Sequence, residues 1–206
     1  MDAAGNLYGS FSHGWYKGGA VSELSPSSHR WTERDLYSFC RFYGCPDGAF
    51  PDYQLTWDTA GNLYGVTTEG GSNNGGVVFE LEHTTGGWKE QVLHSLRSSS
   101  SDGYAPYAGP VVDQAGNVYG TTLQGGGGAG CGPTGCGTVY QLSKGKDGRW
   151  SETILYNFPH YPKNGGGPGT PVTVDKAGNL YGTTTGGGYP NCSCGGSLQA
   201  DAREWR

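Results

Sequence analysis

One nine-residue string recurs four times along the chain, each time directly after an aspartate. The copies read AAGNLYGSF, TAGNLYGVT, QAGNVYGTT and KAGNLYGTT, and the preceding aspartates are Asp2, Asp58, Asp113 and Asp175. Successive copies begin about 55 residues apart. Self-similarity at such a period is typical of a repeat array, in which each unit folds alike and packs against its neighbours.

Three further segments recur in the same order within each unit. GGVVFEL and GTVYQL follow the first string, and WTERDLYSF, WKEQVLHSL and WSETILYNF come next. PDYQLTWD, APYAGPVVD and GTPVTVD lead into the next aspartate. These segments have the length and the β-branched and aromatic content of strands. Each unit therefore contains four strand-sized segments, which predicts an all-β fold.

The pattern inside the segments predicts a sheet that is covered on both sides. In WSETILYNF, strict alternation puts Trp150, Ile154, Tyr156 and Phe158 on one face and Leu155 on the other. The Asp-x-x-Gly-Asn segment reads as a turn, with an aspartate that accepts backbone amide protons and a glycine at positive φ. The recurring aspartates are accordingly assigned to structure.

Composition supports a folded protein built from turns and short strands. The 206 residues include 40 glycines, and 6 tryptophans and 14 tyrosines supply the large apolar surfaces that disordered chains lack. The net charge of −5 comes with no basic stripe, so we expect no nucleic-acid partner. No run approaches the roughly 18 apolar residues of a membrane span.

A four-stranded sheet cannot bury both faces alone, so we predict a β-propeller-like array of four-stranded blades, about three and a half to four per chain. In each blade the strand ending in aspartate is innermost, and the tryptophan segment is outermost. We predict one repeat domain, 1–206, with a partial blade at 1–39, blades at 51–96 and 105–158, and a partial blade at 169–206. A linear solenoid or a β-sandwich is the alternative.

The chain ends bear on closure of the array. The chain opens at a second strand, and after Gly196 the string SLQADAREWR replaces the expected apolar strand. Met1 is followed at once by the first repeat, so we expect a fragment boundary there. Four blades, with incomplete terminal ones, would close a small ring. Alternatively, a half ring forms a homodimer that completes the ring, because exposed strand edges recruit other chains.

Six cysteines fall into three close pairs, Cys40 with Cys45, Cys131 with Cys136, and Cys192 with Cys194. Local disulfides in an oxidising compartment are the favoured interpretation, and closing each of the first two loops would contribute about 2 kcal/mol. Free thiols and a zinc site remain alternatives. We therefore expect an extracellular or cell-surface location.

The DxxGNLYGTTxxGG string, the GTVYQL segment, WxExxLYxF and the DGxxP approach to the next aspartate resemble the GloVer tandem repeat of bacterial extracellular proteins. The resemblance covers about Asp2 to Gly188. The core string is also similar, more weakly, to a strand of two-component regulator propellers. The resemblance implies secretion and a propeller-like array, but it brings no reaction and no catalytic residue.

Residues present in only one copy are free to serve function. Glu69 is a lone carboxylate where the other copies have Gln124 or Gly186. Glycoside hydrolysis needs two carboxylates, about 5–5.5 Å or 6.5–9.5 Å apart. The candidate catalytic residues are Glu69, Asp47 and Asp102, with Asp52 beside them. Solvated loop charges and turn formation are the alternative roles for these side chains.

Aromatic residues supply the candidate ligand-binding positions. Trp57 replaces valines at the end of an inner strand, where an indole would stack on a sugar ring or pack in the core. His13 and Trp15 interrupt the loop pattern, and Tyr104 completes the set. The five histidines show no metal spacing, and His94 stands where other copies have tyrosine, which indicates packing. We therefore predict no metal and no cofactor, and the lack of nucleophile-elbow and phosphate-loop motifs disfavours serine-hydrolase chemistry and phosphate binding.

These features predict a secreted β-propeller that binds carbohydrate, a small-molecule ligand or a cell-surface polymer. A glycoside hydrolase that uses paired carboxylates is the alternative, and a purely structural repeat array is the third. Fold alone does not decide between them.

Overall fold

The computed structural model describes residues 1–12, 17–98, 102–127, 133–158, 165–186 and 196–200, the last of these by their backbone alone. Every regular element in this part of the chain is a β-strand. The first sheet holds β1 (Leu7–Phe11), β2 (Ala20–Pro26) and β3 (Trp31–Ser38). The all-β prediction is confirmed, and no described element is a helix long and apolar enough to cross a membrane.

Three more sheets follow along the chain. The second sheet holds β4 (Thr56–Trp57), β5 (Leu63–Thr67), β6 (Asn74–Thr84) and β7 (Gly87–Arg97). The third holds β9 (Val111–Val112), β10 (Val118–Thr122), β12 (Thr138–Lys144) and β13 (Trp150–Asn157). The fourth holds β14 (Thr173–Val174), β15 (Leu180–Thr184) and β16 (Gly196–Ala200). A two-stranded ribbon pairs β8 (Gly103–Tyr104) with β11 (Gln124–Gly125).

The two four-stranded sheets share one order of strands, and the first and fourth sheets keep the part of that order that their three described strands represent. A short strand that ends at the aspartate pairs with the GNLYG strand. The GNLYG strand pairs with the third strand of the unit (β6 or β12), and the tryptophan strand forms the far edge. All pairings within these four sheets are antiparallel. This is the strand order that the sequence predicts within a unit.

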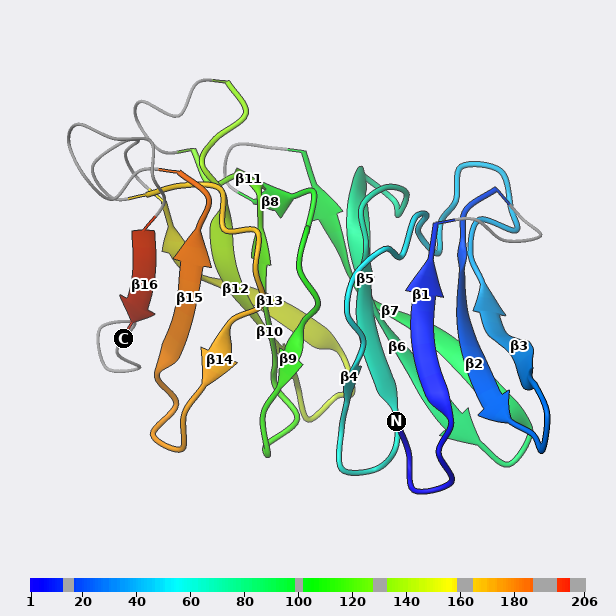
Figure 1. Ribbon diagram of the computed structural model, residues 1–206. Helices are drawn as coiled ribbons and strands as arrows, with labels where there is room; N and C mark the ends of the chain where they lie inside the picture. Colours follow the sequence, from blue (N-terminus) through cyan, green and yellow to red (C-terminus); the bar gives the residue numbers. More distant parts are fainter. Residues whose placement is uncertain (13–16, 99–101, 128–132, 159–164, 187–195, 201–206) are drawn as a thin grey trace.

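The four sheets stand side by side in a row, and an apolar cluster fills each interface between neighbours (Figure 1). In β6, Val77 and Phe79 pack toward the first sheet while Val78 packs toward the third. All three side chains are fully buried. The expected coverage of a sheet on both faces is therefore present, and it is the main source of stability in such an array.

A β-bulge in each tryptophan strand overturns the strict alternation expected for WSETILYNF. The register shifts between Val139 and Tyr140, which leaves Leu155 as the extra residue of β13. Ile154 packs on the core between the second and third sheets, whereas Leu155 and Tyr156 pack on the core between the third and fourth. Residues before and after the bulge therefore face different neighbouring sheets. The same shift occurs in β3 and β7.

The recurring aspartates hold one hydrogen-bond network in all four copies. Oδ1 of Asp113 accepts the backbone amides of Ala115 and Asn117, and Oδ2 accepts the Asn117 side chain and the Tyr119 hydroxyl. Asp2, Asp58 and Asp175 accept the equivalent four bonds. These bonds join the turn to the strand that follows, which agrees with the structural role predicted for these residues.

The outward face of the first sheet carries no neighbouring sheet, and the first and fourth sheets stand at opposite ends of the row (Figure 1). On this open face Leu7, Phe11 and Trp31 are 40%, 42% and 53% exposed. Leu63, which occupies in the second sheet the position of Leu7, is fully buried. The described sheets thus form an open row.

The Cys40–Cys45 disulfide expected from the sequence is present. Cys136 also takes part in a disulfide. Cys131, Cys192 and Cys194 lie outside the described residues. The Cys40–Cys45 bond closes a short loop directly after the first sheet, which we call the disulfide loop (residues 40–45).

Candidate functional site

The aspartates of the two Asp-Gly turns that connect one sheet to the next, Asp47 and Asp102, are buried at the interfaces between sheets. Asp47 lies between the first and second sheets, where its Oδ2 accepts the Tyr37 hydroxyl at 2.9 Å and its Oδ1 accepts the Cys40 amide at 3.2 Å. Gly48 follows because a Cβ atom there would meet Thr67 Oγ1 at 2.4 Å. The aspartate therefore does more than shape the turn, since its side chain reaches into the interface.

Glu90 lies close to this aspartate from the opposite sheet. Burial, together with the negative charge of Asp47, raises the pKa of Glu90 to about 7. Its Oε1 atom is buried without a hydrogen-bond partner. The first interface therefore holds a carboxyl group that is partly protonated at neutral pH beside a second carboxyl group.

The next interface repeats this arrangement with one substitution. His94 takes the place of Tyr37, Asp102 that of Asp47, and Glu152 that of Glu90. Nε2 of His94 lies 3.3 Å from Oε2 of Glu152 and 3.9 Å from Oδ2 of Asp102. Burial raises the pKa of Glu152 to about 7, although the nearby His94 opposes the shift. Burial lowers the pKa of His94, but the two carboxylates outweigh it and leave a net rise.

The bulge explains why these groups meet. Glu152 precedes the bulge of its strand and faces the preceding sheet, whereas His94 follows the bulge of β7 and faces the next sheet. Each interface therefore receives a glutamate from one side and a tyrosine or histidine from the other. Sequence reasoning missed this cluster because it assigned His94 to packing. The usable signal was a histidine in a tyrosine position of a unit that also retains the aspartate and the glutamate.

A pocket of about 510 Å³ lies where β3 and β7 cross. Polar side chains dominate its wall, and the Trp88 ring joins them. The lining includes Asp35, Tyr37, Arg41, Trp88, Lys89 and Glu90. Arg41 belongs to the disulfide loop. The next two residues of that loop point to solvent, because Phe42 is 73% exposed and Tyr43 is fully exposed.

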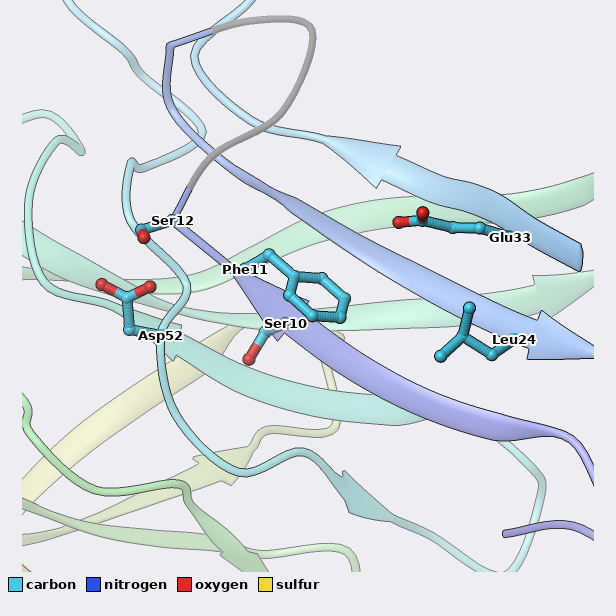
Figure 2. Close-up of a pocket in the computed structure, with 6 residues that line it drawn as sticks. All are labelled: Ser10, Phe11, Ser12, Leu24, Glu33 and Asp52. Atoms are coloured by element: carbon cyan, nitrogen blue, oxygen red, sulfur yellow. The ribbon is translucent and has the colours of Figure 1, made fainter. Parts of the chain in front are cut away.

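A second pocket, of about 560 Å³, occupies the open face of the first sheet. Ser10, Phe11, Ser12, Leu24, Glu33 and Asp52 line it. Figure 2 shows the Phe11 ring between Asp52 on one side and Glu33 on the other. Asp52, one of the predicted carboxylates, is exposed and faces this pocket.

The predicted site residues do not gather in one place. Asp47 and Asp102 lie in different interfaces, and Glu69 is exposed, with its backbone paired to Ala49 by hydrogen bonds of 2.8 and 3.2 Å. Tyr104 is half-buried and pairs with Gln124 in the β8–β11 ribbon. Asp102 therefore lies in a different interface from Asp47, whereas Glu69 pairs through its backbone with Ala49, two residues after Asp47.

Trp57 lies at the other end of the second sheet. Trp57 pairs with Leu63 at the start of β5. Thr67, at the end of β5, lies roughly 13 Å from Leu63 along the strand, and Glu69 comes two residues later. The Trp57 ring packs edge-on against Tyr8 at 4.8 Å and lies 6.1 Å from Trp88. His13 and Trp15 lie outside the described residues. The aromatic cluster of Tyr8, Trp57 and Trp88 leaves the edge of Trp57 open to solvent.

Comparison with known families agrees with this repeated architecture. The model of the Gloeobacter/Verrucomicrobia repeat matches residues 1–134. The chain belongs to this repeat family. The match covers the first interface, the disulfide loop, His94 and Asp102, and it ends before β12, β13 and Glu152. It confirms the resemblance noted from the sequence. No curated protein matches the chain.

Proposed function

We propose that this protein is an extracellular member of the Gloeobacter/Verrucomicrobia repeat family that binds a carbohydrate or a cell-surface polymer without chemical turnover. The observation that carries the proposal is the disulfide loop, which holds Phe42 and Tyr43 in solvent beside the pocket between β3 and β7. The disulfides also agree with an oxidising compartment. Closure of the four sheets around one axis, as in a propeller, is part of this proposal.

The loop has the properties of a preorganised binding element. Phe42 and Tyr43 are adjacent and form one exposed apolar patch, a feature typical of binding sites, and a short disulfide-closed loop loses little conformational entropy on binding. Tyrosine adds a hydroxyl group that donates and accepts hydrogen bonds. An aromatic ring also stacks on the apolar face of a sugar ring.

The neighbouring pocket supplies polar partners. Arg41 and Lys89 are exposed donors, and Asp35 is an exposed acceptor. The Trp88 ring adds an apolar surface to the same wall. A mixture of one aromatic ring with charged donors and acceptors suits a polyhydroxylated or acidic polymer better than an apolar ligand.

The test is affinity electrophoresis of the whole chain in gels that contain a panel of neutral and acidic polysaccharides. The proposal expects at least one polymer to retard the wild type, and the double change Phe42→Ser with Tyr43→Ser to restore free migration. Tyr107→Ser, which removes an exposed tyrosine from a different segment, serves as the matched control and keeps the retardation. Absence of retardation by every polymer, or equal retardation of the double variant, would contradict it.

Glycoside hydrolysis is the second candidate, and one observation favours it. Glu90 lines the same pocket with its pKa raised to about 7, while Asp47 lies near it. Paired carboxyl groups with different protonation states are what a general acid and its partner require. The opposing observation is that the same pairing recurs at the next interface, as expected of a structural element.

Turnover of chromogenic glycosides separates the two functions. If the pocket hydrolyses a glycoside, Glu90→Gln abolishes turnover while the protein still binds the polymer. Glu69→Gln is the control, because Glu69 is exposed and pairs only through its backbone in the described structure. Retardation without turnover supports binding alone, and absence of both leaves a structural array as the remaining function.

A further inference from the structure

The three side chains His94, Asp102 and Glu152 offer a ligand set that the proposed polymer binding does not use. Among the described residues they form the one group of three or more potential metal ligands whose ligand atoms all lie within 4.8 Å of one another. The histidine comes from the second sheet, the glutamate from the third, and the aspartate from the turn between them. The set therefore bridges two sheets.

The distances suit a small divalent ion. Ligand atoms bound tetrahedrally to Zn²⁺ at about 2.0–2.2 Å lie roughly 3.4 Å from one another. Nε2 of His94 lies 3.3 Å from the Glu152 oxygen and 3.9 Å from the Asp102 oxygen. One imidazole with two carboxylates is a donor set taken by Zn²⁺, Mn²⁺, Fe²⁺ and Co²⁺.

A second observation points to a missing partner at this position. Oε1 of Glu152 is buried and makes no hydrogen bond, and the buried Nε2 of His94 has only its ion-pair contacts to the two carboxyl groups, without good hydrogen-bond geometry. Buried polar atoms are almost always satisfied, because leaving one unpaired costs about 1–3 kcal/mol. A metal ion between the three side chains would satisfy both atoms and would offset the negative charge of the two carboxylates.

At the first interface, a tyrosine stands in the position that His94 occupies at the second. There the Tyr37 hydroxyl donates to Asp47 at 2.9 Å, so a proton donor occupies the position of His94. A phenol with an ordinary or raised pKa is a poor metal ligand at neutral pH, and burial raises the pKa of Tyr37. At the third interface Gly165 and Gly166 replace the aspartate. Only the second interface combines histidine, aspartate and glutamate.

We propose that His94, Asp102 and Glu152 bind one divalent transition-metal ion, with Zn²⁺ as the reference ion, and that the ion joins the second sheet to the third. The ion would lie in the interface between the second and third sheets and not in the pocket between β3 and β7. Its role would therefore be to stabilise the contact between these two sheets. This differs from the expectation of no metal, which rested on the spacing of histidines along the sequence.

The experiment uses the whole chain, freed of metal by dialysis against a chelator and titrated with Zn²⁺ by calorimetry and with Co²⁺ by visible absorption. The wild type is expected to bind one equivalent of each ion at pH 7.5 and to melt at a higher temperature with Zn²⁺ present. His94→Tyr restores the residue of the first interface and is expected to lose the equivalent while it remains folded. Glu152→Gln tests a second ligand with an isosteric change.

Two further variants sharpen the result. His83→Asn removes an exposed histidine and is the matched control, so it keeps the single equivalent. Tyr37→His gives the first interface the same three side-chain types and is expected to raise the stoichiometry to two. The assignment is overturned if the wild type binds neither ion, if His94→Tyr binds as the wild type does, or if Tyr37→His still binds one equivalent.

Discussion

The hydroxyl group of Tyr37 donates a hydrogen bond of 2.9 Å to Oδ2 of Asp47, and the pair occupies the interface between the first two sheets. One residue belongs to the edge strand of the first sheet and the other to the turn that leads into the second. Asp47 is buried, and Glu90 adds a second carboxyl group nearby. The phenol proton and the Cys40 amide therefore each satisfy one oxygen of a carboxyl group that the apolar interface would otherwise exclude.

Removing that proton tests how much the interface depends on it. Tyr37→Phe keeps the ring and deletes the hydroxyl, so one oxygen of a buried carboxylate loses its partner. We expect the free energy of unfolding to fall by about 1–3 kcal/mol. Urea unfolding at pH 7.5 measures this, and Tyr43→Phe, which removes the hydroxyl of a fully exposed tyrosine, is the control with no expected change. Equal stability of the two variants would contradict the prediction.

Glu90 makes a pH-dependent contribution to stability. Burial raises its pKa to about 7, above the value of an unfolded chain, so the folded state holds the proton more tightly. The stabilisation is complete below the unfolded pKa and is lost as the pH rises toward 7. Glu90→Gln removes this titration. We therefore expect the variant to lose less stability than the wild type between pH 5 and pH 8.

Glu33 provides the matched control for that measurement. It occupies the same place in the first tryptophan segment, but it is exposed on the open face. Glu33→Gln is expected to follow the wild-type dependence of melting temperature on pH. If Glu90→Gln and Glu33→Gln change the pH dependence equally, the raised pKa does not arise from burial at the interface.

The repeat itself made most of the fold predictable. The four strand-sized segments, their order in a sheet and the Asp113 type of turn follow from spacing and side-chain chemistry in one unit. The sheet face on which each residue after the bulge lies could not be predicted from the sequence. A single extra residue such as Leu155 reverses the alternation, and no residue type identifies it in advance.

The candidate sites were harder to predict from the sequence than the fold was, for the same reason. Asp47 and Asp102 were singled out, but their partners Glu90 and Glu152 were not, because a glutamate recurs at this position in every tryptophan segment. Comparison of the copies finds residues that differ between units. The second cluster instead joins one differing residue, His94, to an aspartate and a glutamate that the first cluster also has. Contacts between units carry the chemistry, and a pattern within one unit does not reveal them.

The disulfide of the Cys40–Cys45 loop should matter more for binding than for the fold of the sheets. Closing a loop of this length contributes about 2 kcal/mol in the chain-entropy model, and the loop lies outside the strands. Replacing both cysteines by serine frees Phe42 and Tyr43 to sample many conformations. We expect retardation by the polysaccharide to weaken while the β-sheet circular dichroism stays unchanged. Unaltered retardation would separate the loop from binding.

The open face of the first sheet should associate with a second copy of the chain. Its equivalents on the other sheets are buried by the preceding sheet, whereas Leu7, Phe11 and Trp31 remain exposed. Each repeat interface joins this face of one sheet to the opposite face of the sheet before it, and the fourth sheet stands at the far end of the row (Figure 1). Continuation of the existing interface therefore favours head-to-tail contact between two copies.

Changing Leu7 to Lys and Trp31 to Glu places charges on this face and should abolish the association. Sedimentation equilibrium over a hundredfold range of concentration is expected to give a rising mass for the wild type and a constant monomer mass for the double variant. Tyr43→Ser, on the disulfide loop, removes a more exposed aromatic ring away from the sheet face and should behave as the wild type. A constant monomer mass for the wild type would contradict the prediction, because the apolar face would then persist in water without a partner.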